Sequence, residues 1–235
     1  MSWSLGLETS SSQTNLCLRS SAGACHEKLI AQSDSHTESL SLNVDALIAE
    51  AGIKPSDVAH VVVAGGPGSF TGLRIGFSFA KGLALSLKCP LSSVSSLAAA
   101  AAEFSSEFPL LCSFRDARRD EVFWEVFSAS DSVVTSIEPA VILPLAQIPE
   151  RRAALAARFS IGTEKVALVS SDDFREQGLS VRKPSHGALQ LLRLSEIEEN
   201  KQKSSFSLSR LLELQPTYLR AVAAKTIAER AILPG

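Results

Sequence analysis

The sequence has little that would place the protein in a membrane, on a nucleic acid or outside the cell. Its longest run of small apolar residues, Leu97 to Ala102, is much shorter than the roughly 20 apolar residues that a membrane-spanning helix needs. The 23 Lys and Arg side chains nearly balance 25 Asp and Glu side chains, so the net charge of −2 argues against a charge-driven nucleic-acid binder. No Lys or Arg precedes Arg19, so the start lacks the basic segment of a signal peptide, and we expect a cytoplasmic protein.

The spacing of cysteine and histidine matches no familiar metal or redox motif. A zinc or dithiol motif needs C-x-x-C spacing, and a helical zinc site needs two histidines four residues apart. Neither pattern occurs, so we expect four reduced thiols, no metal ion and no cofactor. The cysteines are Cys17, Cys25, Cys89 and Cys112, and the histidines are His26, His36, His60 and His186.

The composition is that of a folded chain, and its charges divide it into two parts. Hydrophobic residues make up 45% of the 235 positions and charged residues 20%, as in globular proteins. Residues 1–103 hold 6 basic and 8 acidic side chains, whereas residues 104–235 hold 17 of each. We therefore predict a first lobe over 1–103 and a second over 104–235, with the C-terminal tail packed back on the first. Because the first lobe has so few charges, we expect another protein, or the second lobe, to cover part of its surface.

Hydrophobic periodicity predicts the same order of elements in both lobes. The first lobe reads as strands over 3–7, 16–18 and 24–31, a helix over about 36–51, a strand over 61–64, a helix to about 87 and a strand over 90–94. The second reads as strands over 110–114, 121–127 and 132–142, a helix within 145–159, a strand over 166–169 and a helix over about 185–200. Two lobes that each begin with a three-strand meander predict a duplicated α/β fold of the actin-like type (ASKHA, ribonuclease-H-like).

The most distinctive string is a glycine loop over 65–76, GGPGSFTGLRIG, between a predicted strand and a predicted helix. It is not a Walker A loop, because no Lys occurs between the start of the loop and Lys81. It is not a nucleophile elbow, because Pro67 and Thr71 flank Ser69 where glycines are needed. A dinucleotide fingerprint also needs glycine at position 71. Two interpretations stay open: an architectural turn, or an anion site formed by free N–H groups at the helix start. The candidate residues are Gly66, Gly68, Ser69, Thr71, Gly72 and Arg74.

The helix after this loop carries small residues at every fourth position, so another backbone can approach it closely. Gly72, Gly76, Ala80 and Ala84 form this stripe. It either packs on the sheet of its own lobe or forms a subunit interface, and the low charge of the first lobe favours the interface. The predicted interface residues are Leu40, Val44, Leu47, Leu73, Gly76, Phe77, Ala80 and Leu83.

The turns that grip phosphates in actin-like ATPases are altered in this sequence. Those turns use glycine so that backbone N–H groups can close on the phosphates. Residues 8–13 read ETSSSQ and residues 116–120 read DARRD, and neither turn contains glycine. We therefore expect no two-sided ATP clamp and no catalytic residue, although Arg118 or Arg119 could contact a phosphate. The alternative is an actin-fold ATPase or kinase, or a peptidase, acting on its own; a peptidase would need His and Asp partners for Ser69, which the sequence does not reveal.

The glycine loop and five shorter strings resemble the TsaB family, also called YeaZ, over nearly the whole chain. The most specific string is GPGSFTGLRIG over 66–76, followed by AKGLA over 80–84. The supporting strings are LETS over 7–10, HTE over 36–38, DARR over 116–119 with EVF over 121–123, and PTYLR over 216–220.

This resemblance implies a non-catalytic, actin-like paralogue of TsaD, the metal-dependent transferase that makes N6-threonylcarbamoyladenosine (t6A) at adenosine 37 of tRNA. The implied protein forms a homodimer through its first lobe when alone, binds and activates a TsaD homologue, and joins the ATPase TsaE in the same complex. It would contact tRNA only through that complex. The H-x-x-x-H metal motif of TsaD is lacking here, in keeping with a role as a scaffold.

Two positions depart from the family pattern. Family members usually have Asp where Glu8 stands and often have Gly where Asp120 stands. The extra methylene of Glu8 changes any tight hydrogen bond in its turn, and Asp120 occupies its turn at a conformational cost.

Overall fold

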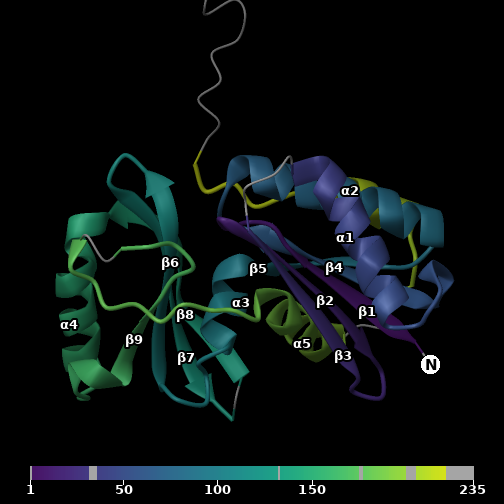
Figure 1. Ribbon diagram of the computed structural model, residues 1–235. Coiled ribbons are helices and arrows are strands. Elements are labelled where there is room, and N and C mark those ends of the chain that lie inside the picture. The colour runs from purple at the N-terminus through teal and green to yellow at the C-terminus, as the bar shows by residue number, and fades with distance from the viewer. Residues whose placement is uncertain (1, 32–35, 132, 175–176, 200–204, 221–235) are drawn as a thin grey trace, which may run out of the picture.

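The computed structural model describes residues 2–31, 36–131, 133–174, 177–199 and 205–220. It has two lobes, each built on one mixed sheet (Figure 1). The first sheet has the strand order β3-β2-β1-β4-β5, and the second has the order β8-β7-β6-β9. Within the described residues, no helix is long and apolar enough to cross a membrane.

The first sheet joins an antiparallel meander to two parallel strands. β1 (Trp3–Glu8), β2 (Gln13–Ser20) and β3 (Cys25–Ala31) form the meander, and β4 (Val58–Gly66) and β5 (Leu91–Ser95) run parallel to β1. α1 (His36–Glu50) and a short 3₁₀ turn (Pro55–Asp57) lead from β3 to β4, and α2 (Phe70–Leu87) leads from β4 to β5. Such helical crossovers are what parallel strands require, and they leave both faces of the sheet buried.

The two faces of this sheet are covered by different helices. Leu5 packs with side chains of α1 and α2, whereas Val62 packs with side chains of α5 (Gly187–Glu199). Figure 1 shows α1 and α2 above the sheet and α5 below it. Gly6 faces α5, and a Cβ atom there would lie only 2.6 Å from the carbonyl oxygen of Ala188. Glycine at position 6 therefore lets α5 lie directly on the strand.

The second sheet repeats the meander and adds one parallel strand. β6 (Leu110–Arg118), β7 (Glu121–Ser130) and β8 (Val133–Pro144) are antiparallel, and β9 (Val166–Val169) runs parallel to β6. α4 (Ile148–Arg158) covers one face, between the 3₁₀ turns Leu145–Gln147 and Thr163–Lys165. α3 (Ser96–Ala102) covers the other face and also contacts α5, so it joins the two lobes.

The predicted actin-like duplication is confirmed, but the last two described helices do not pack on the second sheet. α5 covers the first sheet, and α6 (Leu208–Glu213) packs on α2 through Leu211. Helices α5 and α6 therefore pack with the first lobe, although the predicted boundary assigns them to the second lobe over 104–235. Residues 221–235 lie outside the described residues. The reason is that the first sheet needs cover on its second face, which the apolar side of α5 supplies.

A pair of glycine substitutions tests the close packing of α5. We expect Gly6→Ala to lower the free energy of unfolding by about 1–3 kcal/mol, because the new Cβ overpacks the contact with Ala188. Gly82→Ala is the control, because position 82 lies in α2 with nothing within 4 Å of a Cβ atom. It should stabilise the protein by about 0.5–1 kcal/mol through helix propensity. Urea denaturation of the two variants measures both values, and two changes of the same sign would contradict this packing.

Candidate functional site

A cleft of about 920 Å³ opens between the two lobes, where the carboxyl ends of β1, β4 and β6 face one another. The first lobe lines it with the β1–β2 turn and the glycine loop, and the second lobe with the end of β6 and the β6–β7 turn. A C-terminal segment over 217–220 completes the wall. The lining residues of these four stretches are 10–12, 67–71, 115–119 and 217–220.

The glycine loop packs against the β1–β2 turn. A Cβ atom at Gly68 would collide with the backbone of Ser10, and one at Gly72 would collide with the carbonyl of Thr9. The Ser69 backbone N–H donates to the Ser10 carbonyl at 2.8 Å, and the Thr9 hydroxyl donates to the Gly72 carbonyl at 2.9 Å. The glycines therefore bring two backbones together, which agrees with the architectural interpretation of the loop. The alternative anion site is not tested by this geometry and stays a prediction.

Other candidate residues of the loop are also engaged in local contacts. Ser69 is the N-cap of α2, because its hydroxyl accepts from the Gly72 N–H at 3.2 Å. The Arg74 guanidinium lies 5.2 Å from the centre of the Phe70 ring. Gly66 adopts φ of +96°, a left-handed conformation that favours glycine. Thr71 is exposed and lines the cleft.

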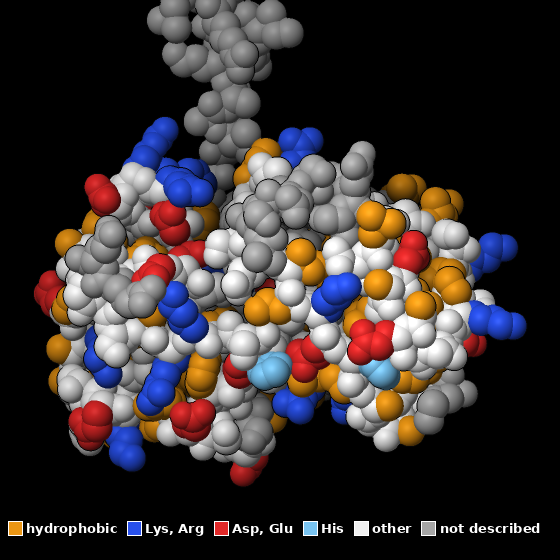
Figure 2. Space-filling model, in the orientation of Figure 1, with side chains coloured by type: hydrophobic (Ala, Val, Ile, Leu, Met, Phe, Trp, Pro, Cys, Tyr) orange, Lys and Arg blue, Asp and Glu red, His pale blue; other side chains and the backbone are white. Residues whose placement is uncertain are grey.

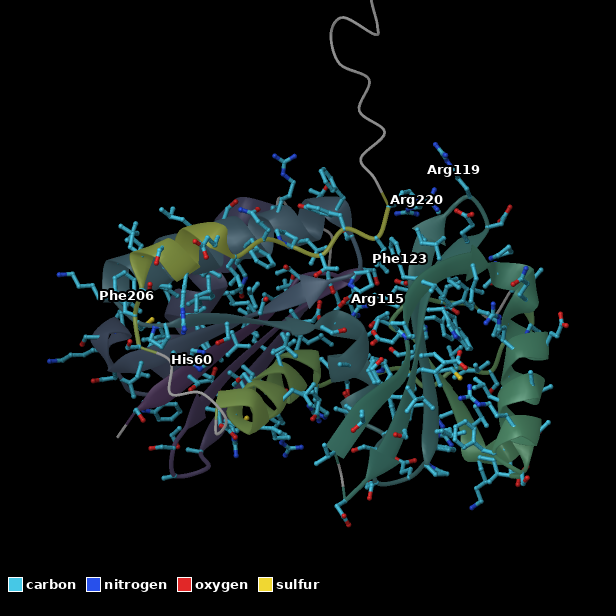
Figure 3. All side chains as sticks on the ribbon, turned by 180° about the vertical axis from the view of Figure 1, so that it is seen from behind. His60, Arg115, Arg119, Phe123, Phe206 and Arg220 are labelled. Carbon is cyan, nitrogen blue, oxygen red and sulfur yellow. The ribbon has the colours of Figure 1, made fainter. Side chains whose placement is uncertain are left out.

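A buried ion pair crosses between the lobes at the floor of the cleft. The Arg115 guanidinium, from β6, donates to the Glu8 carboxylate, from β1, at 3.5 Å, and the two side chains are only 4% and 5% exposed. Figure 3 shows Arg115 where the two lobes meet. Arg115 Nε and Nη1 have no hydrogen-bond partner within the part of the chain that the structure describes. The Glu8 carboxylate therefore supplies the negative charge that balances this buried guanidinium.

Glu8 also closes the turn that follows β1. Its Oε1 atom accepts from the Ser10 backbone N–H at 2.6 Å and from the Ser10 hydroxyl at 2.5 Å. These are the donors that a glycine-containing phosphate turn would direct at a phosphate. In this turn both groups donate to the carboxylate of Glu8.

The β6–β7 turn is closed by carboxylates in the same way. Asp116 Oδ1 accepts from the Arg118 N–H at 2.7 Å, and the Asp116 N–H donates to the Asp172 carboxylate at 2.7 Å. Arg118, Arg119 and Asp120 all have positive φ, between 57° and 65°, which matches the conformational cost expected for Asp120. The two arginine side chains are exposed at the rim, where basic side chains gather on the second lobe in Figure 2.

The segment 217–220 crosses from the first lobe to the second at the mouth of the cleft. The Thr217 N–H donates to the Gly65 carbonyl at 2.8 Å, and the Tyr218 ring lies 5.3 Å from the Phe70 ring. Arg220 then pairs with Glu121 of β7, and Figure 3 shows it on the side of the second lobe. Sequence reasoning used this string only as a mark of resemblance. Its role as a tie between lobes depends on contacts with residues far away in the sequence, such as Gly65 and Glu121, which periodicity does not reveal.

The predicted interface stripe lies inside the first lobe. Seven of the eight side chains or glycines are buried in the layer between α1, α2 and the first sheet, and Leu83 is half-buried on the same core. The prediction that these residues form a partner surface therefore disagrees with their burial. The small residues of α2 approach the chain's own backbone, since a Cβ at Gly76 would collide with the Thr9 hydroxyl. The buried seven are Leu40, Val44, Leu47, Leu73, Gly76, Phe77 and Ala80.

The outer surface of the same helices carries other apolar side chains. Leu42 of α1 is 69% exposed, Leu212 of α6 is 63% exposed, and Leu85 of α2 and Leu208 of α6 are each about half exposed. Figure 2 shows hydrophobic side chains gathered over α1 and α2. We call these four leucines the outer leucines. They are exposed apolar side chains of this helix layer, so a partner could reach them without unfolding the lobe.

The peptidase alternative finds no support in the cleft. Ser69 caps a helix, and no histidine is among the described residues that line the cleft. His60 lies on the far side of the first lobe, where its ring contacts the Ser92 hydroxyl at 3.0 Å. Among the described residues, no group of three or more His, Cys, Asp or Glu side chains could hold a metal ion.

The two meander-led sheets and the cleft between them define a two-lobed, actin-like α/β protein. Residues 29–158 match the family model described as TsaD, tRNA N6-adenosine threonylcarbamoyltransferase. The structure of YeaZ from Pseudomonas aeruginosa, 25% identical, superposes with a TM-score of 0.74 and covers 93% of this chain and 100% of that one. The chain therefore belongs to this TsaD family, on its TsaB (YeaZ) branch.

Two curated relatives carry the same branch name. The tRNA threonylcarbamoyladenosine biosynthesis protein TsaB of Bacillus subtilis is 38% identical over 96 residues, which are 41% of this chain. That match spans 42% of the Bacillus protein, less than half of its length. The protein of the same name from Haemophilus influenzae is 28% identical over 235 aligned residues, covering 92% of both chains.

A charge-removing substitution tests the buried pair. We expect Glu8→Gln to lower the free energy of unfolding by about 3 kcal/mol, because it leaves the Arg115 guanidinium buried without a countercharge. Glu121→Gln is the matched control, since it removes a more exposed partner of Arg220 at the same junction and should cost less than about 1 kcal/mol. Chemical denaturation compares the two, and a larger loss for Glu121→Gln would overturn the ranking.

Proposed function

We propose that this chain is a non-catalytic subunit of the machinery that makes t6A at adenosine 37 of tRNA. In this role it binds and activates a TsaD homologue, works with the ATPase TsaE in the same complex, and acts in the cytoplasm. It meets tRNA only through that complex. The proposal draws on the TsaB names of two relatives and on the family match over residues 29–158.

The state of the two phosphate turns is the observation that carries the non-catalytic role. In the first turn, Glu8 holds the backbone N–H and the hydroxyl of Ser10. In the second turn, Asp116 holds the N–H of Arg118. A phosphate chain entering the cleft would have to displace both carboxylates, which repel it because they carry the same charge. The chain's own acidic groups thus fill the positions that an actin-fold ATPase needs for its nucleotide.

The outer leucines support a partner surface on the helix layer of α1, α2 and α6. Scattered single leucines are ordinary on a protein surface, but these four lie on three helices that pack together over one sheet. The first lobe also carries few charges, which suits the centre of an interface. We propose that the TsaD homologue binds this surface and that the homodimer of the isolated chain uses it in its absence.

Substitutions on this surface test the proposal. We expect Leu85→Arg and Leu212→Arg each to weaken binding of the TsaD homologue at least tenfold, because a charge would be buried in an apolar contact. Ile197→Arg is the matched control, since Ile197 is also an exposed apolar residue on a helix of the first lobe, but α5 covers the opposite face of the sheet. Calorimetric titration gives the affinities, and thermal melts should remain near the wild-type value. Loss of binding in Ile197→Arg alone would move the interface to the α5 side.

A further inference from the structure

The β2–β3 hairpin brings together two cysteines that no sequence motif connects. Cys17 lies in β2 and Cys25 begins β3. The antiparallel register pairs Cys17 with Glu27 and Arg19 with Cys25, so the two cysteines are diagonal neighbours on one face of the hairpin. Their Sγ atoms are 3.4 Å apart. The spacing of eight residues in sequence matches no C-x-x-C pattern, and only the strand register creates this pair.

The two thiols differ sharply in their access to solvent. Cys25 is exposed, whereas Cys17 is buried in the core between the first sheet and α5, beside Leu191. Burial, reinforced by the contact with the Cys25 sulfur, raises the pKa of the Cys17 thiol well above its usual value. Cys89 and Cys112 are both buried. Cys25 is therefore the thiol that a dissolved oxidant reaches first, and Cys17 is the sulfur beside it.

We propose that Cys17 and Cys25 form a redox-active dithiol that a two-electron oxidant of the peroxide class converts to an intramolecular disulfide. In the first step the Cys25 sulfur attacks a peroxide oxygen, the O–O bond breaks, and Cys25 becomes a sulfenic acid while one water leaves. In the second step the Cys17 sulfur attacks the Cys25 sulfur, the S–O bond breaks, and the Cys17 proton leaves with the hydroxide as a second water. Two thiols lose two electrons in total, and one hydrogen peroxide is reduced to two waters.

The β2–β3 hairpin allows the two sulfur atoms to move from contact to bonding distance. They must close from 3.4 Å to the disulfide bond length of about 2.05 Å. Cys25 follows directly on the exposed turn 21–24, in which Gly23 has φ of +93°, so the start of β3 can shift without disturbing the core. Cys17 can stay in place beneath α5. The ion pair between Arg19 of β2 and Glu196 of α5 also holds this helix on the strand. The bond would tie β3 to β2, which is one of the strands that α5 contacts.

Mass spectrometry of the full-length chain tests this proposal with hydrogen peroxide as the oxidant. The intact protein should lose about 2 Da, and the number of thiols open to alkylation after denaturation should fall from four to two. Trypsin cuts after Arg19 and Lys28, so the bridge should join the peptides 1–19 and 20–28, which are separate in the reduced digest. Dithiothreitol should reverse all three changes.

Variants separate this pair from ordinary surface oxidation. Cys25→Ser changes an exposed side chain by one atom and should abolish the joined peptides, whereas Cys89→Ser should form them as the wild-type chain does. Four alkylatable thiols after peroxide treatment would overturn the proposal. So would a Cys25 that goes on to sulfinic acid, or that links two chains, without joining peptides 1–19 and 20–28.

Discussion

The structure depends on the direct contact between the β1–β2 turn and the start of α2. Three glycines, Gly68, Gly72 and Gly76, remove the side chains that would otherwise separate these backbones. The contact fixes the glycine loop at the end of β4 and so fixes the edge of the inter-lobe cleft. Any side chain at these positions would push α2 away from Thr9 and Ser10 and change the shape of the cleft.

Two ties across the cleft then hold the lobes together. The buried pair of Glu8 and Arg115 joins them at the floor, and the segment 217–220 joins them at the mouth through Thr217 and Arg220. Glu8 accepts hydrogen bonds from Ser10 and pairs with Arg115, so one carboxylate both closes the β1–β2 turn and joins the two lobes.

Local pattern predicted the elements well, because each strand and helix shows its period within a few residues. The meanders, α1, α2 and α4 all occur near their predicted positions. The stripe of Gly72, Gly76 and Ala80 also predicted a close approach correctly, but not which backbone approaches. A small side chain is equally suited to a partner and to the chain's own Thr9, so periodicity alone does not decide between them.

Contacts between distant segments account for what sequence reasoning missed. The return of α5 to the first sheet depends on the need of that sheet for cover on its second face. Glu8 could be recognised as an acid in a turn, but its pairing with Arg115 joins positions 107 residues apart. Cys17 lies next to Cys25 because of the register between β2 and β3. A slip of one residue in the hairpin would change every cross-strand pair, so the sequence alone does not reveal this one.

We propose that the chain acts by binding a paralogous transferase and not by turning over a ligand in its own cleft. Light scattering after size exclusion tests it most directly, with the chain alone and mixed with the TsaD homologue of the same cell. We expect the chain alone to form a homodimer, which a one-to-one complex replaces on mixing. Failure of the two proteins to associate, with and without TsaE and ATP, would contradict it.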